Sequence, residues 1–248
     1  DIRTIGLIDY KTGQRTDVTV HVQGKRMDFP VRKAILEFDK VSAILHIKSN
    51  HLSVRDFQGR IHEGTLSGSG EFDFLAIGKT TYDVQARLKD VNFQKLTLAL
   101  FKYGDSSGKL SGQGSFKGVF DNWSTLEGSG TLRVEEGNIM SIPFLGGLSK
   151  FIGTLLPLGY ETAHQARGDF VIEKGVIKTD KLEIFGINFA VVCQGSYDIE
   201  KDKVDADARV SSRGLLVLIS PLVWPLGKLF EYHADGTFGE PNWQPKNL

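Results

Sequence analysis

The side chains that could act in catalysis or bind a metal ion are few and scattered along this chain. The histidines are His21, His46, His51, His62, His164 and His233. None belongs to an H-x-x-x-H or H-E-x-x-H pattern, the spacings that place two metal ligands on one helix face. His62 and Glu63 form an isolated pair in a predicted hairpin turn, where we expect both side chains to be solvated. The histidines therefore predict no metal site.

The other reactive groups also lack partners. Cys193 is the single cysteine among 248 residues, which excludes an intrachain disulfide framework and a multi-cysteine metal site. It lies in the apolar segment "FAVVCQG", which favours a buried and inert thiol over a nucleophile. Asp205 and Asp207 share one side of a predicted strand and indicate a solvated face. With no G-x-S-x-G elbow either, we predict a protein that is not an enzyme and uses no metal or cofactor.

Composition narrows the possible partners. Lys plus Arg equals Asp plus Glu, at 30 each, so no overall basic field attracts nucleic acid. Apolar residues make up 40% of the chain, which suffices for a core but not for an integral membrane protein. The chain begins at Asp1 with neither Met nor a signal-like segment, so we expect a fragment or a processed product.

Most of the chain alternates polar and apolar residues with period two. The clearest segments are "TDVTVHVQG", "VSAILHIKS", "TYDVQARLKD" and "VDADARVSS". Turn signals such as "KTGQ", "KSNH" and "IEKDK" separate the predicted strands. This pattern gives each strand one solvent-exposed side and one buried side, which is typical of an antiparallel sheet. We predict a mainly β protein built as an elongated, curved antiparallel sheet.

Two short sequence patterns each occur twice in the chain; these echoes of one segment in another indicate a repeated structural unit. "GTLSGSGEF" (64–72) and "GKLSGQGSF" (108–116) share the pattern G-x-L-S-G-x-G-x-F at a distance of 44 residues. "LRVEEGNI" and "FVIEKGVI" form a second echo and predict two hairpins with Gly at the turn. The glycines do not match the dinucleotide fingerprint, which requires a third Gly and a following helix. They instead indicate bulges, coiling or close approach of another backbone.

The segment "GNIMSIPFLGGLSKFIGTLLPLGY" (137–160) breaks the alternation. Pro143, Pro157 and Lys150 interrupt it, so it is a poor candidate for a membrane span. Between the prolines its large apolar residues recur at helical spacing, which predicts a short amphipathic helix over 144–156. The stripe that we expect to bind an apolar partner is Phe144, Leu148, Phe151, Ile152 and Leu155.

A second segment, "LLVLISPLVWPLGKLFEY" (215–232), carries the same stripe. Ser220 and Pro221 suit an N-cap and a first helical residue, and Pro225 should kink the helix. This pattern predicts an amphipathic helix over 221–232. Its apolar stripe includes Leu222, Leu226 and Phe230.

Residues from about 104 to 245 resemble the C-terminal region of AsmA-like proteins. The resemblance rests on "GSFKGVFDNWSTLEGSGTLRVEEGNIMSIPFLGGLSKFI", on "ARGDFVIEKGVIKTDKLEIFG" and on "LVWPLGKLFEYHADGTFGEPNWQP". In that family a G-x-G-x-L strand, a hairpin and an "IPxLxxLxxLL" helix occur in this order. The match is weaker over residues 1–103, so we expect a β-repeat part there and an AsmA-like part with two capping helices over 104–248, in one continuous domain.

The resemblance implies a function in the bacterial envelope. AsmA-like proteins are related to TamB-like bridge transporters, whose curved sheets form an apolar groove that is thought to conduct phospholipid between inner and outer membranes. By this resemblance the chain is expected in the periplasm of a Gram-negative-type bacterium, anchored to the inner membrane in the full-length protein. Its expected partners are phospholipid acyl chains, the membrane surface and envelope proteins, with Ile172 and Ile184 joining both stripes in lipid binding.

One alternative stays open from the sequence: a structural or adaptor module of the cell envelope, with a closed apolar core and no lipid transport. The two interpretations differ in how the apolar side of the sheet is filled. If Ile172, Val176, Leu182, Ile184 and Val191 form one continuous core with the helices, the structural module is favoured. An apolar channel that stays open favours lipid binding.

Overall fold

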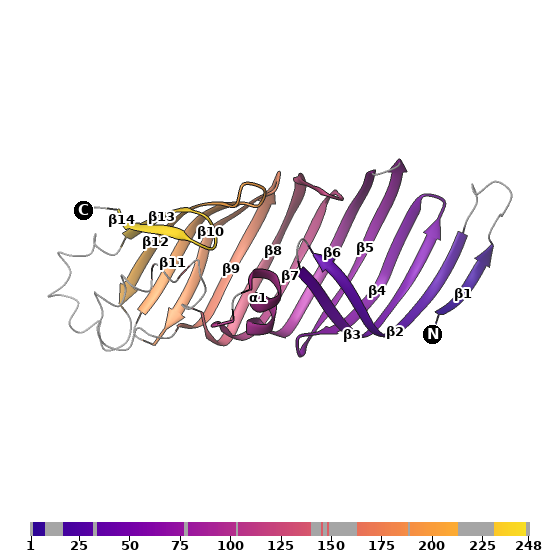
Figure 1. Cartoon of the computed structure of the whole chain (residues 1–248), viewed down its shortest axis with the longest axis horizontal. Coiled ribbons are helices and arrows are strands. Elements are labelled where there is room, and N and C mark those ends of the chain that lie inside the picture. Colours follow the sequence, from indigo (N-terminus) through magenta and orange to yellow (C-terminus); the bar gives the residue numbers. More distant parts are fainter. Residues whose placement is uncertain are drawn as a thin grey trace.

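The computed structural model describes residues 2–7, 17–31, 34–76, 79–102, 104–139, 145, 148, 163–187, 189–212 and 231–246. These residues form one open antiparallel sheet of 14 strands, in which each strand pairs with its neighbours in the chain (Figure 1). The strands are β1 (Ile2–Leu7), β2 (Asp17–Val31), β3 (Ala34–Lys48), β4 (His51–Ile61), β5 (Gly64–Ala76), β6 (Lys79–Asn92), β7 (Ser107–Val119), β8 (Asn122–Asn138), β9 (Ala163–Glu173), β10 (Val176–Gly186), β11 (Phe189–Asp198), β12 (Lys203–Ser212), β13 (Glu231–Gly236) and β14 (Pro241–Pro245). The prediction of a mainly β, elongated and curved antiparallel sheet is confirmed.

Turn chemistry explains why neighbouring strands pair. At the β9–β10 turn both Lys174 and Gly175 have positive φ, at 51° and 76°. Two such residues twist a two-residue turn in the same sense as the flanking strands, so the hairpin closes without splaying. This is the hairpin predicted from "FVIEKGVI". The hairpin predicted from "LRVEEGNI" is wrong, because residues 132–138 all belong to strand β8, with a bulge at Glu136 in place of a turn. The sheet is not interrupted at the expected boundary between the two parts of the chain, 1–103 and 104–248, because β6 of the first part pairs with β7 of the second.

One edge of the sheet is bent by a series of bulges. Lys40, Asp56, Asp90 and Glu136 all have positive φ and stand where the register between two strands shifts. Lys40, Asp90 and Glu136 lie toward the edge at which β6 ends and β7 begins, and Asp56 lies in the middle of β4. A bulge adds one residue to one strand and bends it locally. The repeated bulges therefore curve this edge of the sheet.

The helix α1 (Phe93–Phe101) connects β6 to β7 at this edge. Asn92 caps its N-terminus by accepting a hydrogen bond from the Lys95 amide at 3.1 Å. Its position is fixed by the buried Thr97, whose hydroxyl lies 2.7 Å from that of Ser106. The sequence did not predict α1, because its leucines at 96, 98 and 100 alternate as in a strand. Leu98 consequently remains 51% exposed.

The two helices that were predicted lie mostly outside the described residues. Within 144–156 only Leu145 and Leu148 are described, and both have helical backbone and are buried. The helix predicted over 221–232 is wrong at its end, because Glu231 and Tyr232 belong to strand β13; residues 221–230 lie outside the described part. The one helix with described ends is α1. In the described part of the chain, no helix has the length and apolar character needed to cross a membrane.

Candidate functional site

Strand register aligns apolar residues into transverse rows on one face of the sheet. Because side chains alternate between the faces of a strand, the paired residues of a row all point to the same side. The four rows are Leu110–Val134–Ala166–Ile184–Val191–Val210, Leu66–Leu88–Gly112–Leu132–Gly168–Leu182–Cys193–Ala208–Tyr232, Phe57–Gly68–Ala86–Gly114–Gly130–Phe170 and Leu45–Val54–Gly70–Val84–Phe116–Gly128–Ile172–Ile177–Tyr197–Val204. No member of these rows is charged.

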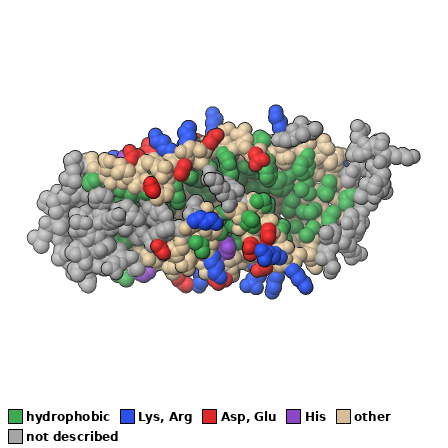
Figure 2. All heavy atoms as spheres, viewed as in Figure 1, with side chains coloured by type: hydrophobic (Ala, Val, Ile, Leu, Met, Phe, Trp, Pro, Cys, Tyr) green, Lys and Arg blue, Asp and Glu red, His purple; other side chains and the backbone are tan. Residues whose placement is uncertain are grey.

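We call this side the α1 face, because α1 packs against it. Leu96 of α1 contacts the same two hydrophobic clusters as Leu88 of β6. The opposite side, the polar face, carries the alternate residues, such as the row Arg87–Gln113–Thr131–Asp169. Figure 2 shows hydrophobic side chains gathered in a hollow of the α1 face, on the side of α1 toward the N-terminal strands, with charged side chains along both edges.

The α1 face is closed at one end and open at the other. Over β10–β14 most of its side chains are buried, with Ile184 and Val191 at 0% exposure and Tyr232 at 1%, while Ile177, Leu182 and Tyr197 are partly buried. Over β4–β9 most of them are only partly buried, and Leu132 is 43% exposed. The sheet therefore presents a continuous uncharged surface that is covered in its C-terminal half and accessible in its middle.

The glycines of the open part lie beneath neighbouring rings. A Cβ atom at Gly130 would stand 2.5 Å from the carbonyl oxygen of Gln113 and 2.7 Å from Cζ of Phe170. One at Gly114 would stand 2.8 Å from Cζ of Phe116. The Phe116 and Phe170 rings stack at 6.2 Å between centroids, across β8. These glycines let strands coil closely and let rings lie flat on the sheet.

The distal halves of β2 and β3 form an arm that folds over this face. Strand β3 bends near Lys40, and the part of the arm beyond this bend crosses over the sheet beside α1 (Figure 1). Met27, Leu36 and Phe38 of the arm share one hydrophobic cluster with Leu66 of β5 and Leu96 of α1. We call residues 25–31 and 34–40 the β2–β3 arm. It partly roofs the α1 face over β4–β6.

A cavity of about 290 Å³ lies between the arm and the strand ends. The arm contributes Phe29 and Pro30, and the sheet contributes Phe72, Tyr82 and Val84 together with the β7–β8 turn. The Phe120 ring packs edge-on against Tyr82 at 5.8 Å between centroids. Phe29 and Phe120 are nearly half exposed, at 46% and 49%, so aromatic rings line the entrance.

The predicted lipid-binding residues divide into three groups. Leu148 and Ile184 are brought together in the closed core, both at 0% exposure. Ile172 is buried in a separate cluster with Leu126 and Ile199. The remaining predicted residues lie outside the described part of the chain: Phe144, Phe151, Ile152, Leu155, Leu222, Leu226 and Phe230.

Sequence reasoning missed several residues of the α1 face. Leu66 and Phe72 of one echo, and Leu110 and Phe116 of the other, all lie on the α1 face. The signal was present in G-x-L-S-G-x-G-x-F, where every specified residue except Ser falls at an even spacing. Period two places all of them on one side of the strand, with small residues between a Leu and a Phe.

The polar face holds one cluster that combines a serine, a histidine and two carboxylates. The two ring nitrogens of His51 lie 2.7 Å from Asp73 Oδ1 and 2.9 Å from Glu71 Oε2, and Ser53 donates to Glu71 at 2.9 Å. The hydrogen bond to Asp73, with that to Glu71, raises the pKa of His51 above its ordinary value. Because both ring nitrogens donate to carboxylates, His51 is placed as a cation and not as a base for Ser53.

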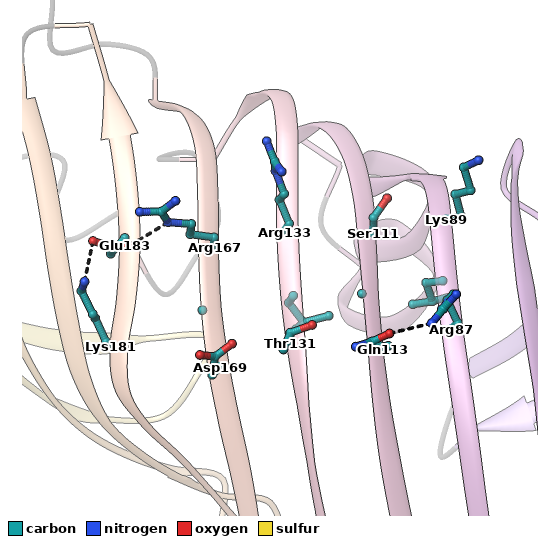
Figure 3. Close-up of a pocket in the computed structure, with 14 residues that line it drawn as sticks. Arg87, Lys89, Ser111, Gln113, Thr131, Arg133, Arg167, Asp169, Lys181 and Glu183 are labelled. Carbon is teal, nitrogen blue, oxygen red and sulfur yellow. Dashed lines mark hydrogen bonds and ion pairs between the residues drawn. The ribbon is translucent and has the colours of Figure 1, made fainter.

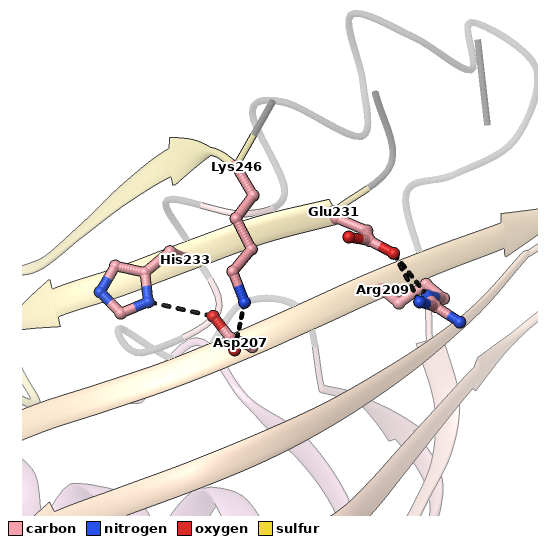
Figure 4. A network of polar contacts seen from close by, with 5 residues as sticks. All are labelled: Asp207, Arg209, Glu231, His233 and Lys246. Carbon is pink, nitrogen blue, oxygen red and sulfur yellow. Dashed lines mark hydrogen bonds and ion pairs between the residues drawn. The ribbon is translucent and has the colours of Figure 1, made fainter. Parts of the chain in front are cut away.

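A second polar cluster ties the last strands to the sheet (Figure 4). His233 of β13 donates to Asp207 at 3.0 Å, Lys246 donates to the same carboxylate at 2.5 Å, and Arg209 bonds Glu231. Burial by itself raises the pKa of Asp207, but the hydrogen bonds from Lys246 and His233 bring it below the ordinary value. This network fastens β13 and the residue after β14 to β12.

The candidate reactive groups behave as structural residues. Cys193 is 2% exposed, and burial raises the pKa of its thiol to about 12, so the predicted inert thiol is confirmed. The expectation of a solvated His62–Glu63 pair holds for Glu63, whose side chain is 61% exposed and bonds Lys95 and Asn92 at the start of α1. It is wrong for His62, which is partly buried, and this burial lowers its pKa. In the described part of the chain no group of three or more His, Cys, Asp or Glu residues could hold a metal ion.

These observations define the α1 face, with its roofing arm, as the candidate functional site. Comparisons of the chain with protein-family models, with curated proteins and with solved structures found no match.

Proposed function

We propose that the α1 face binds phospholipid acyl chains and conducts them along the sheet between the inner and outer membranes of a bacterial envelope. The observation that carries this proposal is the set of four uncharged rows, which crosses the strands and stays accessible over β4–β9. Exposed apolar surface of this extent marks a binding site in a soluble protein. An acyl chain gains about 0.8 kcal/mol for each CH₂ group that it buries on such a surface.

The geometry suits a chain-like ligand better than a compact one. The rows run across successive strands, so the uncharged path follows the long axis of the sheet. The flat rings over Gly114 and Gly130 keep the path smooth. The β2–β3 arm covers one section of it. A long apolar chain needs these properties and no specific polar contact.

The setting of this function rests on the resemblance to AsmA-like proteins. It gives a periplasmic location, an inner-membrane anchor in the full-length protein, and membrane surfaces and envelope proteins as partners. The proposal involves no catalysis, no cofactor and no nucleic acid.

A second candidate function is a structural or adaptor module of the envelope. The closed core over β10–β14 favours it for that part of the sheet, where Val191 and Tyr232 of the α1 face are buried. In this case the exposed residues of the middle strands would contact protein instead of lipid.

The test is native mass spectrometry of the purified chain for bound phospholipid, with two matched variants. Leu132→Asp places a carboxylate on the α1 face, whereas Ser129→Asp places it on the polar face of the same strand; both positions are exposed. We expect Leu132→Asp to lose most of the bound lipid, since an acyl chain cannot solvate a charge, and Ser129→Asp to retain it. Equal lipid in both variants, or none in the parent chain, would favour the structural module.

A further inference from the structure

The polar face carries a hollow that no part of the proposed lipid function uses. It has a volume of about 590 Å³ and spans β6 to β10 (Figure 3). Its charged lining consists of five basic residues, Arg87, Lys89, Arg133, Arg167 and Lys181, and two acidic residues, Asp169 and Glu183. The lining therefore has a net charge of +3, in a chain whose overall formal charge is zero.

Strand register concentrates this charge. Arg133 of β8 stands directly opposite Arg167 of β9, and like charges in this arrangement destabilise a sheet. Arg133 is balanced by Glu135 two residues along its own strand, and Arg167 shares Glu183 with Lys181. These two cations also lower the pKa of Glu183. The single carboxylate of Glu183 thus neutralises only one of the two positive charges of Arg167 and Lys181, which leaves a net positive charge at this side of the hollow.

On the other side of the hollow, fewer of the positive charges are paired with a carboxylate. Arg87 donates to the neutral side-chain oxygen of Gln113 at 3.0 Å, and within the described part of the chain it forms no ion pair. Lys89 likewise has no ion pair with any described residue. Figure 3 shows Lys89 and Arg133 on either side of Ser111, with Arg167 next to Arg133. The basic side chains thus form an arc above short polar residues.

The short residues supply neutral hydrogen-bond donors. Ser111 and Thr131 offer hydroxyl groups, and Gln113 offers the amide nitrogen that remains free to donate when its oxygen accepts from Arg87. Guanidinium, ammonium and hydroxyl donors around one hollow match the oxygens of a phosphate group, which Arg binds in a fork geometry. Asp169 lies in the lower row beside Thr131, away from Arg133 and Lys89.

We propose that this hollow is a phosphate-binding site, with Arg133, Arg167 and Lys89 as its charged ligands and Ser111 as a hydroxyl donor. The phosphate group is free or part of a lipid headgroup. The site lies on the opposite side of the sheet from the α1 face, so it is independent of acyl-chain binding, and either can fail without the other.

The test is titration of the full chain with inorganic phosphate by calorimetry, and in parallel with phosphatidylcholine vesicles that contain or lack phosphatidic acid. The variant is Lys89→Gln/Arg133→Gln. Its control is Lys117→Gln/Lys178→Gln, which removes the same charge from exposed positions on the polar face outside the hollow. Circular dichroism checks that both remain folded, as expected for exposed side chains.

We expect the Lys89/Arg133 variant to bind phosphate at least about tenfold more weakly, with a reduced dependence on salt. The control should bind as the parent chain does. Binding to phosphatidic acid vesicles but not to inorganic phosphate, with the same variant effect, would assign the site to a lipid headgroup. No binding to either probe, or an equal loss in both variants, would overturn the proposal.

Discussion

The strands β10–β14 and the strands β4–β9 follow the same alternation of polar and apolar residues but fill their α1 face differently. The C-terminal strands place small aliphatic residues there, such as Ala206, Ala208 and Ala234, around the large Ile184 and Tyr232. These side chains pack into a core that excludes water. The middle strands place glycine between Phe and Leu, so their rings lie on the sheet and remain partly exposed. The same sheet thus contains a buried core over β10–β14 and an accessible apolar surface over β4–β9.

This difference indicates how one sheet can combine a stable core with an accessible apolar surface. A surface that binds apolar ligands has to expose apolar area and gains little stability from it. The closed core supplies that stability elsewhere along the same hydrogen-bonded ladder. Four predictions test this difference between the two groups of strands.

The largest effect is expected from truncating one side chain in each half. Ile184→Ala removes a fully buried side chain and should lower the free energy of unfolding by about 2–5 kcal/mol. Leu132→Ala removes a side chain that is 43% exposed and should cost about 1 kcal/mol or less. Chemical denaturation of both variants measures the contrast. Equal costs would show that the middle strands are covered as well as the C-terminal ones.

A smaller effect is expected from exchanging glycine and alanine. Gly130→Ala forces a Cβ atom against the Gln113 carbonyl oxygen and the Phe170 ring, and should cost about 1–3 kcal/mol. Ala208→Gly, in the closed half, should cost about 1 kcal/mol through lost packing and added backbone entropy. The control Ser129→Ala lies on the polar face and should change stability by less than about 0.5 kcal/mol. A stabilising Gly130→Ala would contradict the close approach described for this strand.

Acid should loosen the closed half at its last strands. The pKa of Asp207 is lower in the folded chain than in the unfolded one, so its contribution is fully present above the unfolded value. That contribution is lost as the pH falls through the folded pKa, below the ordinary aspartate range. Hydrogen exchange of β13 and β14 should therefore accelerate in acid. In Asp207→Asn this added acid sensitivity should be absent, and its persistence would assign the effect to other groups.

The smallest effect is expected from His51 in the open half, with the opposite sign. Its pKa is raised by Asp73 and Glu71, so its contribution is fully present below the unfolded value of about 6.5. It is lost as the pH rises through the raised folded pKa. His51→Gln should remove this weak dependence between neutral and mildly alkaline pH, as measured by thermal unfolding. Because the group is exposed, a large change would be inconsistent with the structure.

The alternation of polar and apolar residues along the chain predicted the antiparallel sheet and which residues share a side of each strand. Period two fixes which residues share a side, so "VDADARV" already separates Asp205 and Asp207 from Ala206 and Ala208. The turn in "FVIEKGVI" and the buried thiol of Cys193 followed from equally local chemistry. Local sequence sufficed here because neighbouring strands in the chain are also neighbours in the sheet.

Tertiary structure decided which part of the apolar face is covered. The sequence did not predict α1, because Leu96, Leu98 and Leu100 alternate as in a strand. The Asn92 cap and the buried Thr97–Ser106 contact favour a helix over a strand here. The folded β2–β3 arm depends on bulges that no composition signal marks. The phosphate hollow depends on register, which places Arg133 opposite Arg167 although 34 positions separate them in the sequence. Such features arise from contacts between distant segments, and the period of a single strand carries no information about them.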